Sequence, residues 1–126
     1  MSNNEEKFLT DTIDLLIEEL NTYIKNNLGR LLLKRNTEKE DFKNRLIKSL
    51  REYSYYLIEN KKKFSSNEIF NLEKTQGAID NYRAFLIKNN FKTQDDQNSD
   101  LLLSITFGFR AELELIKSKI LTNTIS

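Results

Sequence analysis

Residues 64–69 read FSSNEI, and within them Ser65 and Glu68 have the spacing of a capping box at the start of a helix. Phe64 and Ile69 flank the box at the positions of a hydrophobic staple, which fixes the direction in which the chain enters the helix. Behind the box, apolar residues recur at three- and four-residue intervals, as on one face of an α-helix. We therefore predict a long helix that starts after Ser65 and ends near residue 90.

The sequence before this box predicts two further helices. Thr37 and Glu40 form a second capping box, and the helical spacing behind it continues to about Lys62. An earlier periodic segment runs from about Glu5 to Asn27, and the pattern leaves open whether that helix continues through residues 30–35.

The sequence after the box predicts a fourth helix. Residues 92–99 are wholly polar and are expected to form a loop, with Ser99 as the N-cap of the helix that follows. Helical spacing then continues towards the C-terminal end, where we expect the last few residues to fray.

Glycine and proline are rare, with three Gly and no Pro among 126 residues. A turn-rich β protein needs these residues at its corners, so the composition favours helices. We predict an all-α fold, an antiparallel bundle of about four long helices that forms a single domain over residues 1–126. The side chains predicted to face its core are Leu9, Ile13, Leu16, Leu20, Tyr23, Ile24, Phe42, Leu46, Leu50, Tyr53, Leu57, Leu72, Ile79, Tyr82, Leu86, Leu102, Ile105, Phe109, Leu113, Ile116 and Ile120.

The chain lacks the side chains that most catalytic and metal sites use, because it contains no Cys and no His. This excludes disulfides, thiol nucleophiles, Ser-His triads and Cys- or His-ligated zinc. Residues 96–107 begin like a calcium loop, but Leu101 stands where the loop needs Gly and Phe107 where it needs Glu. We therefore expect no enzymatic activity and no catalytic, cofactor-binding or metal-binding residues.

The first residues are polar and acidic, and no apolar signal segment follows them. Uninterrupted aliphatic runs are no longer than three residues, far short of a membrane span. We expect a cytoplasmic protein that does not enter the membrane.

The net charge of +1 is unevenly distributed, since residues 1–20 carry −5 and residues 25–63 carry +7. Basic groups interleaved with tyrosines can bind single-stranded nucleic acid through charge and stacking. The candidate contacts for such a site are Arg51, Tyr55, Lys61, Lys62 and Lys63. Acidic residues dilute this region, so nucleic-acid binding is the alternative function and not the favoured one.

Three charged residues fall close to the apolar faces of their helices, namely Glu19, Arg83 and Glu112. An unpaired buried charge is costly, so we predict that they form a buried charge cluster. The sequence leaves open whether such a cluster is structural or binds a small polar ligand.

Some apolar and small residues are left over when the core faces are assigned. In the fourth helix Leu103 and Phe107 are predicted to point away from the core, and in the third Phe70, Gly77 and Ala84 recur every seven residues. A helix that is apolar most of the way round is either central in its fold or covered by a partner. We therefore expect protein–protein contact through these residues, by an adaptor, chaperone, inhibitor or homodimer subunit, with irregular packing of the bundle as the other interpretation.

Overall fold

A computed structural model describes the backbone of residues 3–26, 36–64, 66–88 and 96–125, and the side chains of residues 4–25, 43–64, 68–88 and 101–122. Within these ranges the chain forms four α-helices and no strand. They are α1 (Asn3–Asn26), α2 (Asn36–Asn60), α3 (Ser66–Lys88) and α4 (Asp96–Ile125), with a short 3-10 turn, η2 (Lys61–Lys63), after α2. The predicted all-α bundle is confirmed.

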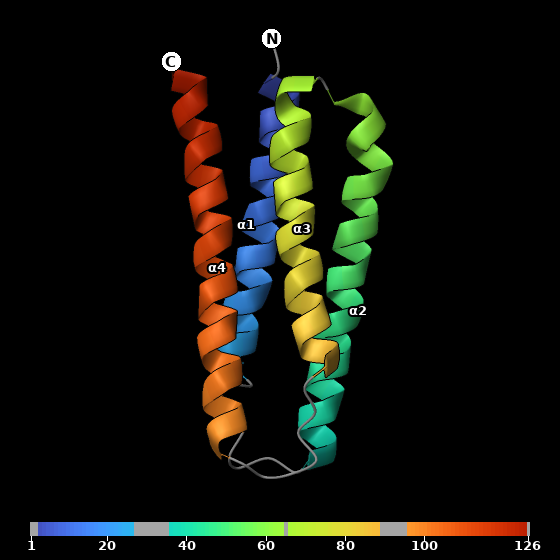
Figure 1. Ribbon diagram of the computed structural model, residues 1–126, viewed down its shortest axis with the longest axis vertical. Coiled ribbons are helices and arrows are strands. Elements are labelled where there is room, and N and C mark those ends of the chain that lie inside the picture. Colours follow the sequence, from blue (N-terminus) through green and yellow to red (C-terminus); the bar gives the residue numbers. More distant parts are fainter. Residues whose placement is uncertain (1–2, 27–35, 65, 89–95, 126) are drawn as a thin grey trace.

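The helices alternate in direction along the long axis, so that the N- and C-terminal ends lie at the same end of the bundle (Figure 1). The closest pairs are α2 with α3, α1 with α4 and α3 with α4, and α1 also approaches α3 across the centre. The backbones of α1 and α2 approach each other less closely than these pairs do. Side chains fill part of this wider spacing, since the Phe8 ring lies 5.1 Å from that of Tyr56 and 5.5 Å from that of Phe64.

One hydrophobic core runs through the bundle, and most of the predicted core residues are fully buried in it. Ile24, Tyr53 and Ile105 lie at its edge, partly buried against it, and the side chain of Phe42 is outside the described residues. The stripes follow heptad-like intervals of three and four residues, which is why antiparallel helices can pack along their whole length.

Polar side chains also lie in the core. Thr12, Thr75 and Thr106 are buried, and each hydroxyl donates to the carbonyl four residues earlier in its own helix, at 2.7–2.8 Å. Because the single Thr106 proton is used in this way, the Tyr82 hydroxyl is the donor in their contact of 2.6 Å. This bond and the stacked rings of Tyr82 and Phe109, 4.5 Å apart, join α3 to α4.

The expected helix boundaries differ from the structure mainly in α4. The helix begins at Asp96, so Ser99 lies inside it and is not its N-cap, and it continues to Ile125 where fraying was expected. The segment before Ser99 contains neither Pro nor Gly, and its Asp, Gln and Asn residues carry only small penalties in a helix.

The remaining boundaries lie close to the predictions. Helix α3 begins at Ser66, directly after the expected cap, and α2 ends two residues before Lys62 with η2 behind it. The side chains of both capping boxes, apart from Glu68, and the open continuation of α1 at 30–35 are outside the described residues. Among the helices that are described, none combines the length and the hydropathy that crossing a membrane requires.

Candidate functional site

The structure does not bring Glu19, Arg83 and Glu112 together as one buried cluster. Glu112 is exposed and lines a groove between α3 and α4, whereas Glu19 lies beside Tyr53 of α2. Within the described residues, no ion pair joins any two of the three. The prediction of a buried cluster is therefore wrong. Glu19 and Glu112 lie about 80° from the centre of their apolar stripes on an ideal wheel, which places them at the edge of the core. Glu19 lies towards α2 and Glu112 towards α3.

Two of these charges still have unusual surroundings. Burial and the carboxylate of Glu19, which accepts a hydrogen bond from the phenol, hold the pKa of Tyr53 above its usual value. The Nε atom of Arg83 is buried and has no hydrogen-bond partner within the described part of the chain. Neither arrangement resembles a catalytic pair, and in the described ranges no group of three or more Asp, Glu, His or Cys side chains could hold a metal ion.

The basic residues near the end of α2 are partly engaged by neighbours. Lys61 Nζ lies 2.6 Å from Glu73 Oε1 of α3, while Lys62 and Lys63 are exposed. Arg51 donates to the Tyr55 hydroxyl at 3.3 Å, and its guanidinium carbon lies 5.3 Å from the centre of that ring. The structure therefore separates the candidate nucleic-acid residues into an Arg51–Tyr55 pair and an exposed Lys62–Lys63 pair.

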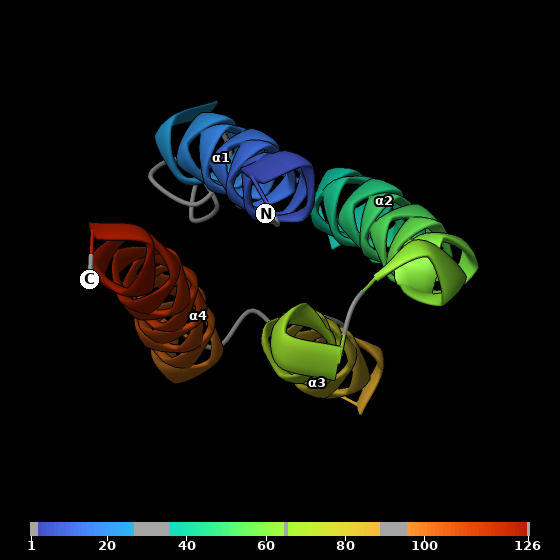
Figure 2. The same ribbon diagram turned by 90° about the horizontal axis from the view of Figure 1, so that it is seen from above.

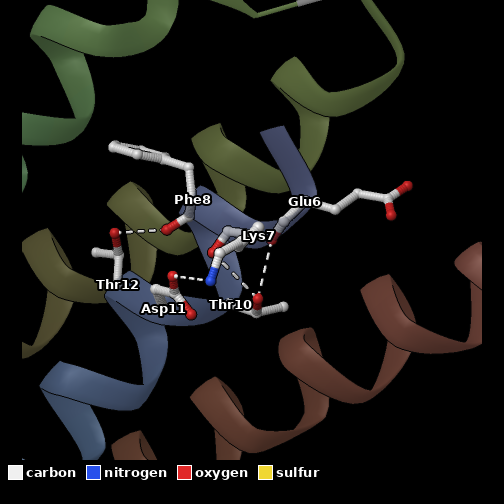
Figure 3. A network of polar contacts seen from close by, with 6 residues as sticks. All are labelled: Glu6, Lys7, Phe8, Thr10, Asp11 and Thr12. Carbon is white, nitrogen blue, oxygen red and sulfur yellow. Dashed lines mark hydrogen bonds and ion pairs between the residues drawn. The ribbon is translucent and has the colours of Figure 1, made fainter. Parts of the chain in front are cut away.

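The acidic helix α1 makes several of its polar contacts internally. Lys7 Nζ lies 3.2 Å from Asp11 Oδ2, and the hydroxyls of Thr10 and Thr12 donate to main-chain carbonyls one turn earlier (Figure 3). Across the α1–α4 boundary, Lys117 pairs with Asp14. These contacts tie the charges of α1 to its own turns and to α4.

The outer side of α3 exposes the three residues that the sequence singled out there. The side chain of Phe70 is 67% exposed, Gly77 and Ala84 are exposed, and a Cβ atom at Gly77 would meet nothing within 4 Å. Lys74 Nζ lies 5.8 Å from the centre of the Phe70 ring. This side of α3 therefore carries Phe70 and, at its edge, the 55% exposed Ile87, with charged neighbours between them.

On α4, the two residues singled out from the sequence have different surroundings. Leu103 is partly buried against the core, and only Phe107 is exposed, with the guanidinium carbon of Arg110 4.8 Å from its ring centre. Leu103 directly follows the core residue Leu102, so it lies 100° round the helix, on the flank of the core stripe and not opposite it. The predicted outward position of Leu103 is thus corrected.

The outward side of α4 is more apolar than these two residues alone suggested. Four large side chains on it are between 39% and 56% exposed, and the residues between them are small. We refer to this surface as the α4 outer face; its members are Leu101, Ser104, Phe107, Gly108, Ala111, Leu115, Ser118 and Leu121. The sequence signal for it is a second set of three- and four-residue intervals on α4, running alongside the core stripe.

Open grooves border the α4 outer face on both sides. On the α3 side, Ser104 and Gly108 line a groove together with Phe85, and on the α1 side Ser118 and Leu121 line another. A Cβ atom at Gly108 would meet nothing within 4 Å, so this glycine opens to the surface. Figure 2 shows α4 at one edge of the bundle, with its outer side turned away from the other three helices.

Comparison of the chain with protein-family models, curated proteins and solved structures gives no match.

Proposed function

We propose that the protein acts through protein–protein contact, with the α4 outer face as the contact surface. The observation that carries the proposal is that α4 is apolar on two faces: one is packed in the core, and the other exposes Leu101, Phe107, Leu115 and Leu121. Scattered apolar residues on a surface need no explanation, but four large apolar side chains on one side of a helix, with small residues between them, favour close approach of another chain.

The energetics of the α4 outer face are consistent with binding. Burial of a Leu or Phe side chain from full exposure contributes about 1.5–3 kcal/mol, and each of these four is roughly half exposed. Covering all of them would contribute on the order of 4 kcal/mol, in addition to backbone contacts at the small residues. Such a surface suits a partner that presents a helix, because two helices can pack closely where the facing residues are small.

The two exposed glycines provide a matched test. Gly108→Arg places a long charged side chain in the α4 outer face, whereas Gly77→Arg places the same side chain on the outer side of α3. Neither would clash inside the bundle, since both sites are open, so the monomer should remain folded in each variant. We expect Gly108→Arg to weaken association at least 10-fold and Gly77→Arg to leave it unchanged.

The measurement is capture of bound proteins on the tagged chain in its native cell, with nuclease-treated and untreated halves. The wild type and Gly77→Arg should retain the same proteins, an untagged second copy included, and Gly108→Arg should lose them. Equal retention by all three chains, or retention of nothing, would contradict the proposal.

Nucleic-acid binding through α2 remains the second candidate. It is favoured by the half-exposed Tyr55 ring of α2 and by the exposed Lys62 and Lys63 of η2, which follows α2 directly. Binding through these residues would fall steeply with salt, because each lysine or arginine contact releases counterions from the phosphate backbone. Anisotropy of a labelled single strand at low salt tests this candidate, and loss of the signal in Lys62→Gln with Lys63→Gln would support it.

A further inference from the structure

The large residues of the α4 outer face are symmetric about one position in the helix. Phe107 and Leu115 each lie four residues from Ala111, on either side of it, and Leu101 and Leu121 each lie ten residues from it. All four side chains are exposed. Large apolar side chains therefore stand at the same heights above and below Ala111.

The small residues repeat the same symmetry. Ser104 and Ser118 each lie seven residues from Ala111, and all three are exposed. In either direction from Ala111, the next members of the face are a large residue, then a serine, then a second large residue. Gly108 alone has no counterpart, because Glu114 occupies its mirror position. Apart from Gly108, the order of large and small residues is the same in both directions, and an antiparallel copy of the same helix can match such an order.

Two-fold symmetry explains why this pattern points to a second copy. In an isologous dimer, residue i of one chain meets residue j of the other, and residue j then meets residue i. With the axis at Ala111, Phe107 would lie level with Leu115 of the second chain, and Ser104 with Ser118. A partner of different sequence, or a parallel copy, requires no such symmetry.

The charges at the edge of the face are complementary under the same symmetry. Arg110 and Glu114 lie on one flank of α4, the flank that also carries Phe107. In an antiparallel pair, equal flanks meet, so Arg110 of each chain would lie about 3 Å in height from Glu114 of the other, at 1.5 Å per residue. Glu114 is exposed and makes no ion pair within the described residues, which leaves it available for this contact.

The guanidinium of Arg110 is already positioned for such a pair. Its Nη1 atom donates to Asn21 Oδ1 at 2.6 Å, and its central carbon lies 4.8 Å from the Phe107 ring centre. These two contacts hold the charge at the edge of the face and leave other N–H donors of the guanidinium unused.

We propose that the α4 outer face binds a second copy of this chain, antiparallel, with the two-fold axis at Ala111. The inference rests on the proposed function, because it names the partner at the same surface. The symmetric part of the face, from residue 101 to residue 121, is about 30 Å long. One helix pair of that length lies at the small end of stable interfaces, so the dimer should dissociate on dilution.

The absence of cysteine from the sequence allows a direct test. In a dimer with this axis, Ala111→Cys places two thiols face to face, so mild oxidation should convert most of the chain into a covalent dimer. Ser104→Cys alone should form no covalent dimer, but a mixture with Ser118→Cys should crosslink. Gly77→Cys, on the outer side of α3, is the control and should not crosslink.

Three outcomes would overturn the second copy as partner. One is a wild type that sediments as a monomer at every concentration, another is a monomeric Ala111→Cys after oxidation, and the third is efficient crosslinking of Ser104→Cys alone, which indicates a parallel pair. A second experiment separates failure of the homodimer from failure of the proposed protein–protein contact. It places a photo-crosslinking residue at position 111 and identifies what is captured in the native cell. Capture of a different protein would overturn only the second copy, whereas capture of nothing at all would overturn both.

Discussion

Gly77 and Gly108 occupy similar places on neighbouring helices, yet their surroundings differ. Both are exposed, and at both a Cβ atom would meet nothing within 4 Å. The residues one turn away from Gly77 on the helix surface are Glu73, Lys74, Asp80 and Asn81. Those one turn away from Gly108 are Ser104, Ile105, Ala111 and Glu112.

This difference shows that a small exposed residue does not by itself mark a contact surface. On α3 the glycine is surrounded by charged and amide groups, whose hydration opposes burial against another chain. On α4 the neighbours are mostly apolar or small, and Phe107 and Leu115 lie further along the same side. The comparison therefore supports α4, and not α3, as the surface to test first.

The largest expected effect on stability comes from placing a glutamate on the core face of α4, compared with placing one on its outer face. Phe109→Glu puts a carboxylate into the core where the ring now stacks on Tyr82, and should cost about 4 kcal/mol or more, enough to unfold a marginally stable domain. Phe107→Glu, two residues away on the outer face, should cost about 1 kcal/mol or less. Circular dichroism during thermal melting measures both, and equal loss of stability would show that Phe107 belongs to the core.

These faces also show how much the sequence predicts. The core stripes are predictable because burial imposes a strict three-and-four spacing, which residues such as Leu102, Phe109 and Leu113 follow. The position of Leu103 is not predictable in the same way. A flank residue can turn inward or outward, and the choice depends on how closely the neighbouring helix approaches.

The predicted charge cluster failed for a related reason. A helical wheel gives the angle of each residue about its own helix, but the distance between Glu19 and Glu112 depends on which helices are neighbours. Polarity alone predicts a loop up to Ser99, whereas α4 begins at Asp96, because nothing in residues 96–99 breaks a helix. The outer face was only partly found, since its small members carry no hydrophobic signal.

The second expected effect is a loss of stability at high pH, caused by the buried Tyr82. Burial raises the pKa of Tyr82 to about 12. Between these two pKa values, about 10 in the unfolded chain and about 12 in the folded protein, the folded state keeps the phenol neutral whereas the unfolded chain releases the proton. The stability is intact below the unfolded value of about 10 and is lost as the pH rises towards 12, by up to about 3 kcal/mol.

Tyr82→Phe removes the ionisable phenol and with it this loss of stability at high pH. The variant also lacks the hydrogen bond to Thr106, which should cost about 1 kcal/mol of stability near neutral pH. Between about pH 9 and about pH 11, the free energy of unfolding should fall less steeply in the variant than in the wild type. Urea titrations across this range give both slopes. Parallel curves for the two chains would contradict the role of burial at Tyr82.

The smallest expected effect on stability comes from replacing each of the two exposed glycines with alanine. Gly77→Ala and Gly108→Ala should each stabilise the folded monomer by about 0.5–1 kcal/mol, since alanine favours the helix and both sites are open. Melts at high dilution compare the two variants as monomers. A gain at Gly77 with a loss at Gly108 under these conditions would show that Gly108 is packed within the single chain.

The pairing of α1 with α4 has a consequence for how the chain reaches its fold. Two of the contacts between these helices join residues that are 89 and 103 positions apart in the sequence, Asn21 with Arg110 and Asp14 with Lys117. Helices α2 and α3, by contrast, are consecutive and can form a local hairpin early. On the ribosome, α1 emerges before α4, its main neighbour, so α4 cannot cover the apolar stripe of α1 until α4 itself has been synthesised.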